Sequence, residues 1–141
     1  MKRKTLILPS KTRGVHLITD VIRKECSDML LHTVHGTLHL FLCHTSAAIT
    51  INEQADPDVA LDLMDILDRI VPMRRELYRH TLEGPDDMTS HALASLIGCD
   101  VHIPIINGRM ALGTWQGIHL CEFRHLAKGR TLIATLHIIQ D

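Results

Sequence analysis

Carboxylate and imidazole side chains gather around the predicted start of a helix in the second half of the chain. The set contains two adjacent acids, a hydroxyl and two imidazoles: Asp86, Asp87, Ser90, His80 and His91. Free amides at a helix N-terminus favour an anion, whereas paired carboxylates favour a cation. The set therefore predicts either a phosphate or diphosphate held with a bridging Mg²⁺, or a transition-metal site of His and Asp side chains. The alternative is an acidic, capped turn with an exposed histidine.

A second polar cluster begins where an apolar strand ends. It brings together an imidazole, two hydroxyls, an amide and a carboxylate: His44, Thr45, Ser46, Asn52 and Glu53. Loops that follow strand ends often carry binding and catalytic residues. We predict a ligand-binding loop here; the alternative is a polar loop in which Ser and Thr form turn hydrogen bonds.

The only tryptophan, Trp115, precedes Gln116 in a run bracketed by Gly113 and Gly117. Glycines at these positions allow a close approach of the backbone. Trp115 is suited to stacking on a flat heteroaromatic ligand, with Gln116 facing the same ligand. The alternative is that the indole ring fills the core.

Glu122 lies in a mostly apolar predicted strand. A carboxylate is costly to bury unless it is paired. We therefore expect Glu122 to pair with Arg109 or Arg124, to bind a cation, or to lie at a rim.

Histidine is unusually frequent, with eleven residues. His35, His39 and His137 lie in strand-like runs, where a structural imidazole is commoner than a metal ligand. Three others lie beside small or acidic polar groups and are the candidate metal ligands: His44, His80 and His91. His80 and His91 are too far apart in sequence to form an H-x-x-x-H pair on one helix.

About eight strands and two or three helices are needed to position these groups. The apolar runs predict strands over 5–8, 15–18, 37–43, 46–51, 101–106, 109–112, 117–123 and 130–139. Helices are expected over 21–30, 57–70 and 88–97. Short connections make the sheet mainly antiparallel, although mixed, and the fold class α+β, in one domain over residues 1–141.

Local signals set several of these boundaries. Asp20 and Asp87 are expected to N-cap the first and third helices, and Asp56-Pro57 starts the second. Asn107-Gly108 predicts a hairpin turn. The stripe of the second helix that we expect to face the core comprises Val59, Leu63, Ile66 and Ile70.

Composition excludes several classes of protein. Apolar residues make up 45% of 141 residues, and the net charge is −1, with 3% aromatics, so nucleic acid is not an expected partner. No apolar run is long enough for a transmembrane helix or a signal peptide, so no membrane association and a cytoplasmic location are expected. The cysteines lack metal-binding spacing and are expected to be buried free thiols: Cys26, Cys43, Cys99 and Cys121.

Taken together, the motifs resemble the YjbQ family, also called the secondary thiamine-phosphate synthase family. The resemblance rests on four segments: His44-Thr45-Ser46-Ala47, Asn52-Glu53 with Asp56-Pro57, Gly84-Pro85-Asp86-Asp87-Met88 with Ser90-His91, and Gly113-Thr114-Trp115-Gln116-Gly117-Ile118. It extends over nearly the whole chain. His119 departs from the family pattern, where an aromatic residue is expected, and Thr89 departs where proline is frequent.

The resemblance implies a homotrimeric enzyme with polar clefts near the subunit contacts. Its activity would be a weak condensation of hydroxymethylpyrimidine diphosphate with thiazole phosphate, which releases pyrophosphate. Catalytic roles would fall to His44, Asp86, Asp87 and His91. Ligand-binding roles would fall to Thr45, Ser46, Asn52, Glu53, Ser90, Trp115 and Gln116, with Mg²⁺ or Zn²⁺ as cofactor.

Two other functions fit the same residues. One is a metal-dependent hydrolase of a phosphorylated small molecule. The other is a non-catalytic trimeric protein that holds a metabolite or a metal. Release of inorganic phosphate would favour the hydrolase, and ligand retention without turnover would favour the binding protein.

Overall fold

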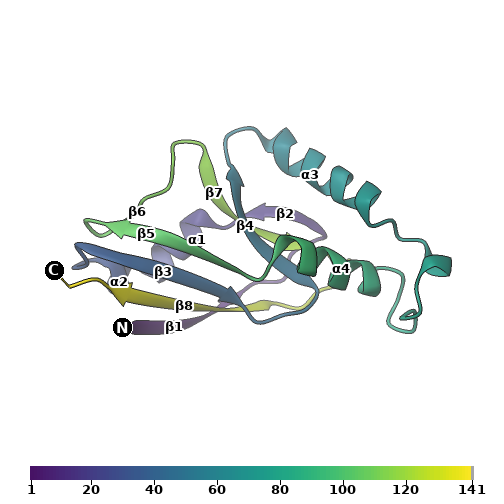
Figure 1. Ribbon diagram of the computed structural model, residues 1–141, viewed down its shortest axis with the longest axis horizontal. Coiled ribbons are helices and arrows are strands. Elements are labelled where there is room, and N and C mark those ends of the chain that lie inside the picture. The colour runs from purple at the N-terminus through teal and green to yellow at the C-terminus, as the bar shows by residue number, and fades with distance from the viewer. Residues whose placement is uncertain (141) are drawn as a thin grey trace.

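Two antiparallel sheets and four helices form the computed structural model, which describes residues 1–140 (Figure 1). One sheet has the order β1-β8-β3-β5-β6 and the other β2-β7-β4. The strands are β1 (Lys2–Leu8), β2 (Gly14–Leu17), β3 (His35–Leu42), β4 (Ala47–Glu53), β5 (Asp100–Ile106), β6 (Arg109–Met110), β7 (Gln116–Glu122) and β8 (Arg130–Ile138). The helices are α1 (Thr19–Glu25), α2 (Ser27–Leu30), α3 (Pro57–Ile70) and α4 (Asp87–Ile97), with a 3-10 turn over Arg75–Leu77. The predicted α+β fold with a mainly antiparallel sheet is confirmed.

The chain packs in three layers. The inner face of the five-stranded sheet, with Leu38 and Leu40 of β3, packs against α1, α2 and one face of the three-stranded sheet. The other face of that small sheet, including Cys121, packs against α3 and α4 through Met64 and Leu93. β7 is central to both contacts, so nearly all of its residues are buried, including the polar His119 and Glu122.

Helix α3 begins as predicted, because the Asp56 side chain accepts a hydrogen bond from the Asp58 amide and Pro57 follows it. The expected buried stripe is wrong in part. Met64 and Leu67 are the buried positions, whereas Ile66 and Ile70 are 42% and 59% exposed. The helix is attached mainly through β2, along a narrow contact that covers only part of its apolar surface.

The predicted helix over 21–30 is instead two helices that meet at Cys26. The Ser27 hydroxyl donates to the Lys24 carbonyl at 2.9 Å, a local hydrogen bond typical of interrupted helices. Asp20 is not the N-cap. It lies inside α1 and pairs with Arg23.

All four cysteines are free thiols, as predicted, but only Cys26 and Cys121 are buried. Burial raises the pKa of Cys26 to about 11 and that of Cys121 to about 12. Both thiols are therefore protonated and unreactive at neutral pH. Cys43 is exposed, contrary to expectation.

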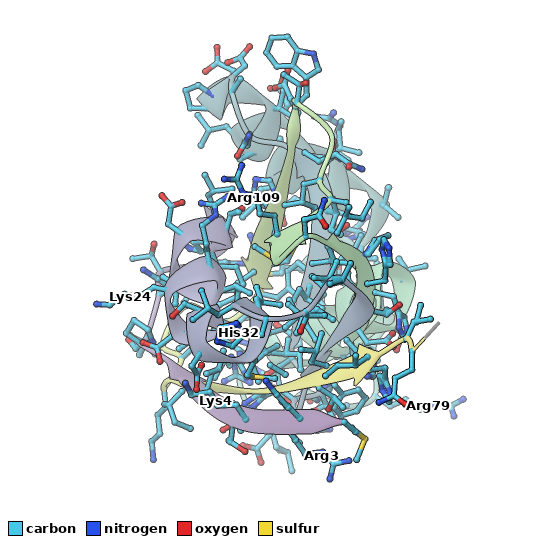
Figure 2. All side chains as sticks on the ribbon, turned by 90° about the vertical axis from the view of Figure 1, so that its left-hand side faces the viewer. Arg3, Lys4, Lys24, His32, Arg79 and Arg109 are labelled. Atoms are coloured by element: carbon cyan, nitrogen blue, oxygen red, sulfur yellow. The ribbon has the colours of Figure 1, made fainter. Side chains whose placement is uncertain are left out.

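Figure 2 labels five of the cationic side chains. Arg3 and Lys4 come from β1, Lys24 from α1, Arg109 from β6, and Arg79 from the loop before α4. The longest helix has 14 residues, and within residues 1–140 no helix is long and apolar enough to cross a membrane.

Candidate functional site

Three potential metal ligands meet at the start of α4. Asp87 and His91 are one helical turn apart and share a face, and His80 reaches them from the preceding loop. The Nε2 atoms of His80 and His91 lie 2.6 and 3.0 Å from the same Asp87 oxygen, Oδ2. The three ligand atoms lie within 4.8 Å of one another, and the rings are tilted by 52°. We call His80, Asp87 and His91 the α4 cluster.

Arg124 anchors the carboxylate of this cluster from the opposite side. Its guanidinium pairs with Oδ1 of Asp87 and lies 3.4 Å from Oδ2 of Asp86, so Oδ2 of Asp87 is left facing the imidazoles. Desolvation acts to raise the pKa of Asp87, but His80, His91 and Arg124 outweigh it and hold that pKa below its usual value. Asp87 is therefore a carboxylate at neutral pH.

Asp86 supports this arrangement rather than facing the imidazoles. Its Oδ2 accepts a hydrogen bond from the His125 amide at 2.8 Å, and its carbonyl accepts one from the Ser90 hydroxyl. Asp86 occupies the N-cap position of α4 without a side-chain cap bond. The predicted cap, Asp87, is the first helical residue, because Arg124 and His80 engage its side chain.

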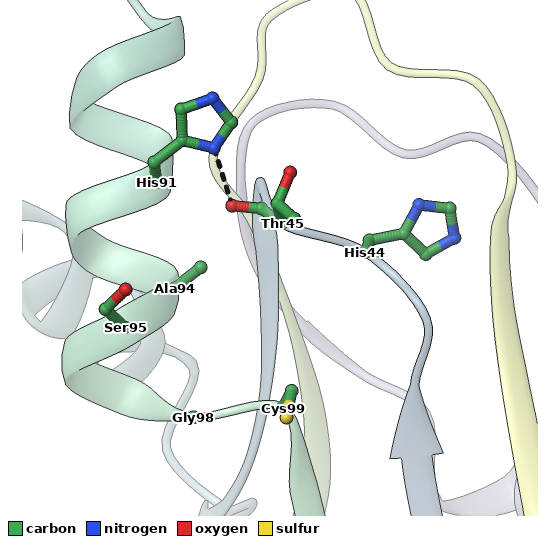
Figure 3. A pocket seen from close by; sticks show the side chains of 7 residues that line it. All are labelled: His44, Thr45, His91, Ala94, Ser95, Gly98 and Cys99. Carbon is green, nitrogen blue, oxygen red and sulfur yellow. Dashed lines mark hydrogen bonds between the residues drawn. The ribbon is translucent and has the colours of Figure 1, made fainter.

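The backbone fixes how His91 is protonated. Its Nδ1 donates to the Thr45 carbonyl at 2.8 Å, as Figure 3 shows, so Nδ1 carries a hydrogen. Nε2 then faces Asp87 either as a second N–H of an imidazolium or as a lone pair on a metal ion. A carbonyl partner on the far nitrogen is typical of metal-binding histidines.

His44 lies outside the α4 cluster. In Figure 3 its ring points away from His91, and its Nε2 accepts the Thr131 amide at 2.7 Å. Burial, and then the charge of Arg130, lower the pKa of His44, so this ring is neutral with its hydrogen on Nδ1. Of the three histidines predicted as metal ligands, the structure thus brings together His80 and His91, with Asp87 as the third group.

Two hollows adjoin at His44. A groove of about 540 Å³ runs between His44 and α4 and is lined by Thr45, His91, Ala94, Ser95, Gly98 and Cys99. The second, of about 460 Å³, is lined by His44, Ser46, Arg124, Leu126, Ala127, Lys128, Gly129 and Arg130. We call the second the basic hollow, because three of its lining residues are cationic. Lys128 and Arg130, which flank Gly129, were not identified as site residues from the sequence.

The partner of Glu122 is neither Arg109 nor the Arg124 side chain. Glu122 is completely buried, and Arg130 donates to both of its oxygens, with Nε at 2.7 Å from Oε1. The same guanidinium donates to the Ser46 hydroxyl and carbonyl at 3.0 and 3.3 Å. Arg130 is the first residue of β8 in the five-stranded sheet, and Glu122 is the last residue of β7 in the three-stranded sheet. Through its bonds to Ser46, Arg130 therefore also holds the loop after β3 against both sheets. The connection between β7 and β8 brings the pair together, since the two residues are eight positions apart in the sequence.

The remaining predicted site residues lie at the other end of the β4–β7 pair. Ala47 is paired with Glu122, and Glu53 with Gln116, so six residues separate the two ends. At about 3.4 Å per residue, this places Asn52, Glu53, Trp115 and Gln116 roughly 20 Å from the Thr45–Ser46 loop. Within one chain, the structure does not bring them to the α4 cluster.

At this distal end, side chains form local hydrogen bonds with nearby backbone amides, and the Trp115 ring is exposed. Trp115 is 63% exposed, so it does not fill the core. Gln116 Oε1 accepts the Gly113 amide at 2.8 Å, and the Asn52 side chain accepts the Glu53 amide at 2.8 Å. A Cβ on Gly117 would lie 2.8 Å from that of Gln54, which confirms the close approach expected there. His119, the family departure, is buried nearby, and its burial lowers its pKa.

Comparison with known proteins gives a consistent result. The family described as "UPF0047 protein YjbQ-like" matches residues 4–138. The UPF0047 protein YjbQ of Escherichia coli O157:H7 is 46% identical over 134 residues, which cover 95% of this chain and 96% of that protein. A conserved hypothetical protein from Thermus thermophilus has 32% identity and a TM-score of 0.80 over 96% of this chain and 99% of its own. A hypothetical protein from Aeropyrum pernix has 25% identity and a TM-score of 0.86 over 99% and 100%.

Proposed function

Because the chain belongs to the YjbQ-like UPF0047 family, we propose that it is a metal-dependent enzyme acting on a small phosphorylated molecule. One observation carries this proposal: two imidazoles and a carboxylate converge at the start of α4, directly beside the basic hollow. A metal ion and a phosphate group could therefore be held next to each other by one short stretch of structure.

The ligand set favours a zinc-like ion over magnesium. Two imidazoles and one carboxylate suit Zn²⁺ or another first-row transition metal, whereas Mg²⁺ prefers oxygen ligands and water. His91 Nδ1 is already engaged by the Thr45 carbonyl, so replacing the Nε2 hydrogen by a metal ion needs no change at that contact. Asp86, bound by Arg124 and the His125 amide, supports the site rather than completing it.

The basic hollow supplies the proposed phosphate contacts. Arg130 is fully used by Glu122 and Ser46. The accessible cations are the exposed Lys128 and the remaining N–H groups of Arg124, whose side chain is 25% exposed and already binds Asp86, Asp87 and the Glu83 carbonyl. The neutral His44 ring holds a hydrogen on Nδ1 at the junction of the two hollows. It is placed to donate to an oxygen of a bound phosphate.

The reaction that the family resemblance implies is condensation with loss of pyrophosphate. The thiazole nitrogen forms a bond to the pyrimidine methylene carbon, while the carbon–oxygen bond breaks and its electron pair leaves on pyrophosphate. A bound metal ion would supply positive charge against that leaving group. Arg124 and Lys128 would hold its oxygens, and His44 would donate a hydrogen bond.

Binding of the planar ring would require a second copy of the chain. Trp115 and Gln116 lie roughly 20 Å from the Thr45–Ser46 loop in one chain, a distance set by about six residues of strand. Trp115 is exposed, as are Leu17 and Leu61 of the neighbouring elements. We therefore propose that the homotrimer places this end of one subunit against the basic hollow of another, where Asn52 and Glu53 would accompany the ring.

The test joins metal content to product analysis. Purified protein is expected to hold about one equivalent of zinc at the α4 cluster and to release pyrophosphate from the two phosphorylated substrates. His91→Ala should lose both the metal and the turnover while keeping its circular dichroism spectrum. His16→Ala, which removes a surface imidazole bonded to the Thr12 carbonyl, is the matched control.

The alternatives give different products. Inorganic phosphate released from a panel of phosphate esters, without condensation, would identify a metal-dependent hydrolase. Ligand retained through gel filtration without turnover in either assay would identify a binding protein. An unchanged metal content and unchanged activity in His91→Ala would refute the proposed site.

A further inference from the structure

A second set of two imidazoles and a carboxylate lies on the outer face of the five-stranded sheet. His39 of β3 is directly paired with His102 of β5, and Asp100 lies two residues before His102 on the same face. The Nε2 atoms of His39 and His102 lie 2.8 and 3.5 Å from one oxygen, Asp100 Oδ2. All three ligand atoms lie within 4.8 Å of one another. We call these residues the sheet cluster.

We propose that the sheet cluster is a second binding site for a first-row transition-metal ion such as Zn²⁺, Ni²⁺ or Cu²⁺. Metal bonds of about 2.1 Å in tetrahedral geometry place neighbouring ligand atoms roughly 3.4 Å apart. The observed separations surround that value. Imidazole nitrogens with one carboxylate oxygen are the ligands that favour these ions over Mg²⁺ or Ca²⁺.

The sheet register holds the three groups in place. Directly paired residues of antiparallel strands have Cβ atoms about 5 Å apart, and residues i and i+2 share a face. The His39 and His102 rings are stacked, with centroids 4.3 Å apart and planes within 10° of parallel. Binding needs these rings to turn so that their lone pairs converge. The torsion concerned, χ2 of histidine, has a broad and shallow energy profile.

The charge around the sheet cluster also favours a cation. On this face, the residues that flank His39 and Asp100 across the strands are Phe41, Ile133, Thr135 and His137, none of which carries a fixed charge. With neutral imidazoles, the Asp100 carboxylate therefore leaves one negative charge without a basic partner beside it in the sheet. The side chains of His39, Asp100 and His102 are 24%, 43% and 63% exposed, so water can occupy the open coordination positions.

The experiment must separate this site from the α4 cluster. Full-length His80→Ala/His91→Ala protein, which lacks two ligands of the α4 cluster, is titrated with Zn²⁺ and Cu²⁺ by calorimetry. One equivalent of metal is expected to bind. Adding His102→Ala should weaken that binding roughly tenfold or more. Adding His32→Ala, which removes an exposed imidazole in the turn after α2, should leave it unchanged.

A second measurement is spectroscopic. Imidazole nitrogen resonances of His39 and His102 in the wild-type chain should shift together as Zn²⁺ is added, and Cu²⁺ bound to the His80→Ala/His91→Ala protein should show two coupled nitrogens in its electron paramagnetic resonance spectrum. No metal bound by the His80→Ala/His91→Ala protein, unshifted His39 and His102 resonances, or equal weakening by His32→Ala would overturn the proposal. None of these outcomes depends on the enzymatic activity proposed for the α4 cluster.

Discussion

The α4 cluster and the sheet cluster contain the same three chemical groups in different surroundings. Asp87 has a side chain only 10% exposed, and Arg124 engages its second oxygen. Asp100 has a side chain 43% exposed, and within residues 1–140 it pairs with the two imidazoles of its own cluster. The difference lies in what surrounds the ligands, which sets how firmly each group is oriented before a metal arrives.

Neighbouring groups that are not themselves ligands orient the ligands of the α4 cluster. Within residues 1–140, the sheet cluster has no such contacts. The Thr45 carbonyl fixes the hydrogen on His91 Nδ1, and Arg124 turns Oδ2 of Asp87 toward the rings. Groups of this kind typically change metal affinity by about 10- to 100-fold. We therefore expect the α4 cluster to bind the same metal ion more tightly than the sheet cluster does.

The largest predicted effect comes from breaking the buried Glu122–Arg130 pair, which supports the α4 cluster but not the sheet cluster. Glu122→Gln leaves the Arg130 guanidinium buried without its counter-charge, which should cost about 3–5 kcal/mol in the free energy of unfolding measured with urea. Because Arg130 also holds Ser46, metal affinity should fall at the α4 cluster and stay unchanged at the sheet cluster.

The control for this substitution is an exposed ion pair. Glu76→Gln removes the partner of Arg74, whose side chain is 64% exposed, and should cost no more than about 1 kcal/mol. Equal losses in the two variants would show that the buried pair does not stabilise this side of the molecule.

The next prediction compares the two carboxylates directly. Asp87→Asn should weaken zinc binding at the α4 cluster by about 100-fold, and Asp100→Asn should weaken binding at the sheet cluster by about tenfold. The larger loss follows because Asp87 is buried and already oriented, whereas Asp100 competes with water. Competition with a chromophoric chelator measures both affinities, each in a protein whose other cluster lacks a histidine. A larger loss at Asp100 would reverse the proposed order of the sites.

A smaller effect tests Arg124 alone. Arg124→Gln keeps every ligand of the α4 cluster but removes the anchor of Asp87, so metal affinity should fall roughly tenfold. Phosphate binding in the basic hollow should weaken as well, because Arg124 is one of its accessible cations. Arg109→Gln, an exposed residue of the short strand β6, is the matched control. If Arg124→Gln and Arg109→Gln have the same metal affinity, Arg124 does not orient the α4 cluster.

Local sequence signals predicted much of the fold. Asp56-Pro57 marks the start of α3, and Asn107 and Gly108 both adopt positive φ in the turn between β5 and β6. These features depend on a few neighbouring residues, so the sequence contains the information directly. The buried face of α3 was misassigned because it depends on how the helix rests on the sheet.

The sheet cluster depends on strand register, which local patterns do not contain, because His39 meets Asp100 across 61 residues. The contact of Arg130 with Ser46, across 84 residues, depends on how distant parts of the chain pack together. The seven-residue length of β4 separates Asn52 and Glu53 from His44, although the sequence places them close together. Proximity along an extended strand is therefore a poor guide to a shared site, because each residue adds about 3.4 Å.

The smallest predicted effect is the acid dependence of Asp87. Its pKa in the folded protein is lowered below the ordinary 3.8, so its ionised form stabilises the fold above that value. That contribution is lost as the pH falls through the folded-state pKa, because the unfolded chain takes up the proton first. The difference in melting temperature between wild type and Asp87→Asn should therefore narrow as the pH falls from about 5 to below about 3. The control repeats the comparison in a background that carries Asp100→Asn. The difference in melting temperature between Asp100→Asn and Asp87→Asn/Asp100→Asn should narrow with falling pH in the same way. A difference that stays constant with pH would mean that the partners of Asp87 do not favour its charged form, and the contrast between the two clusters would lose its electrostatic basis.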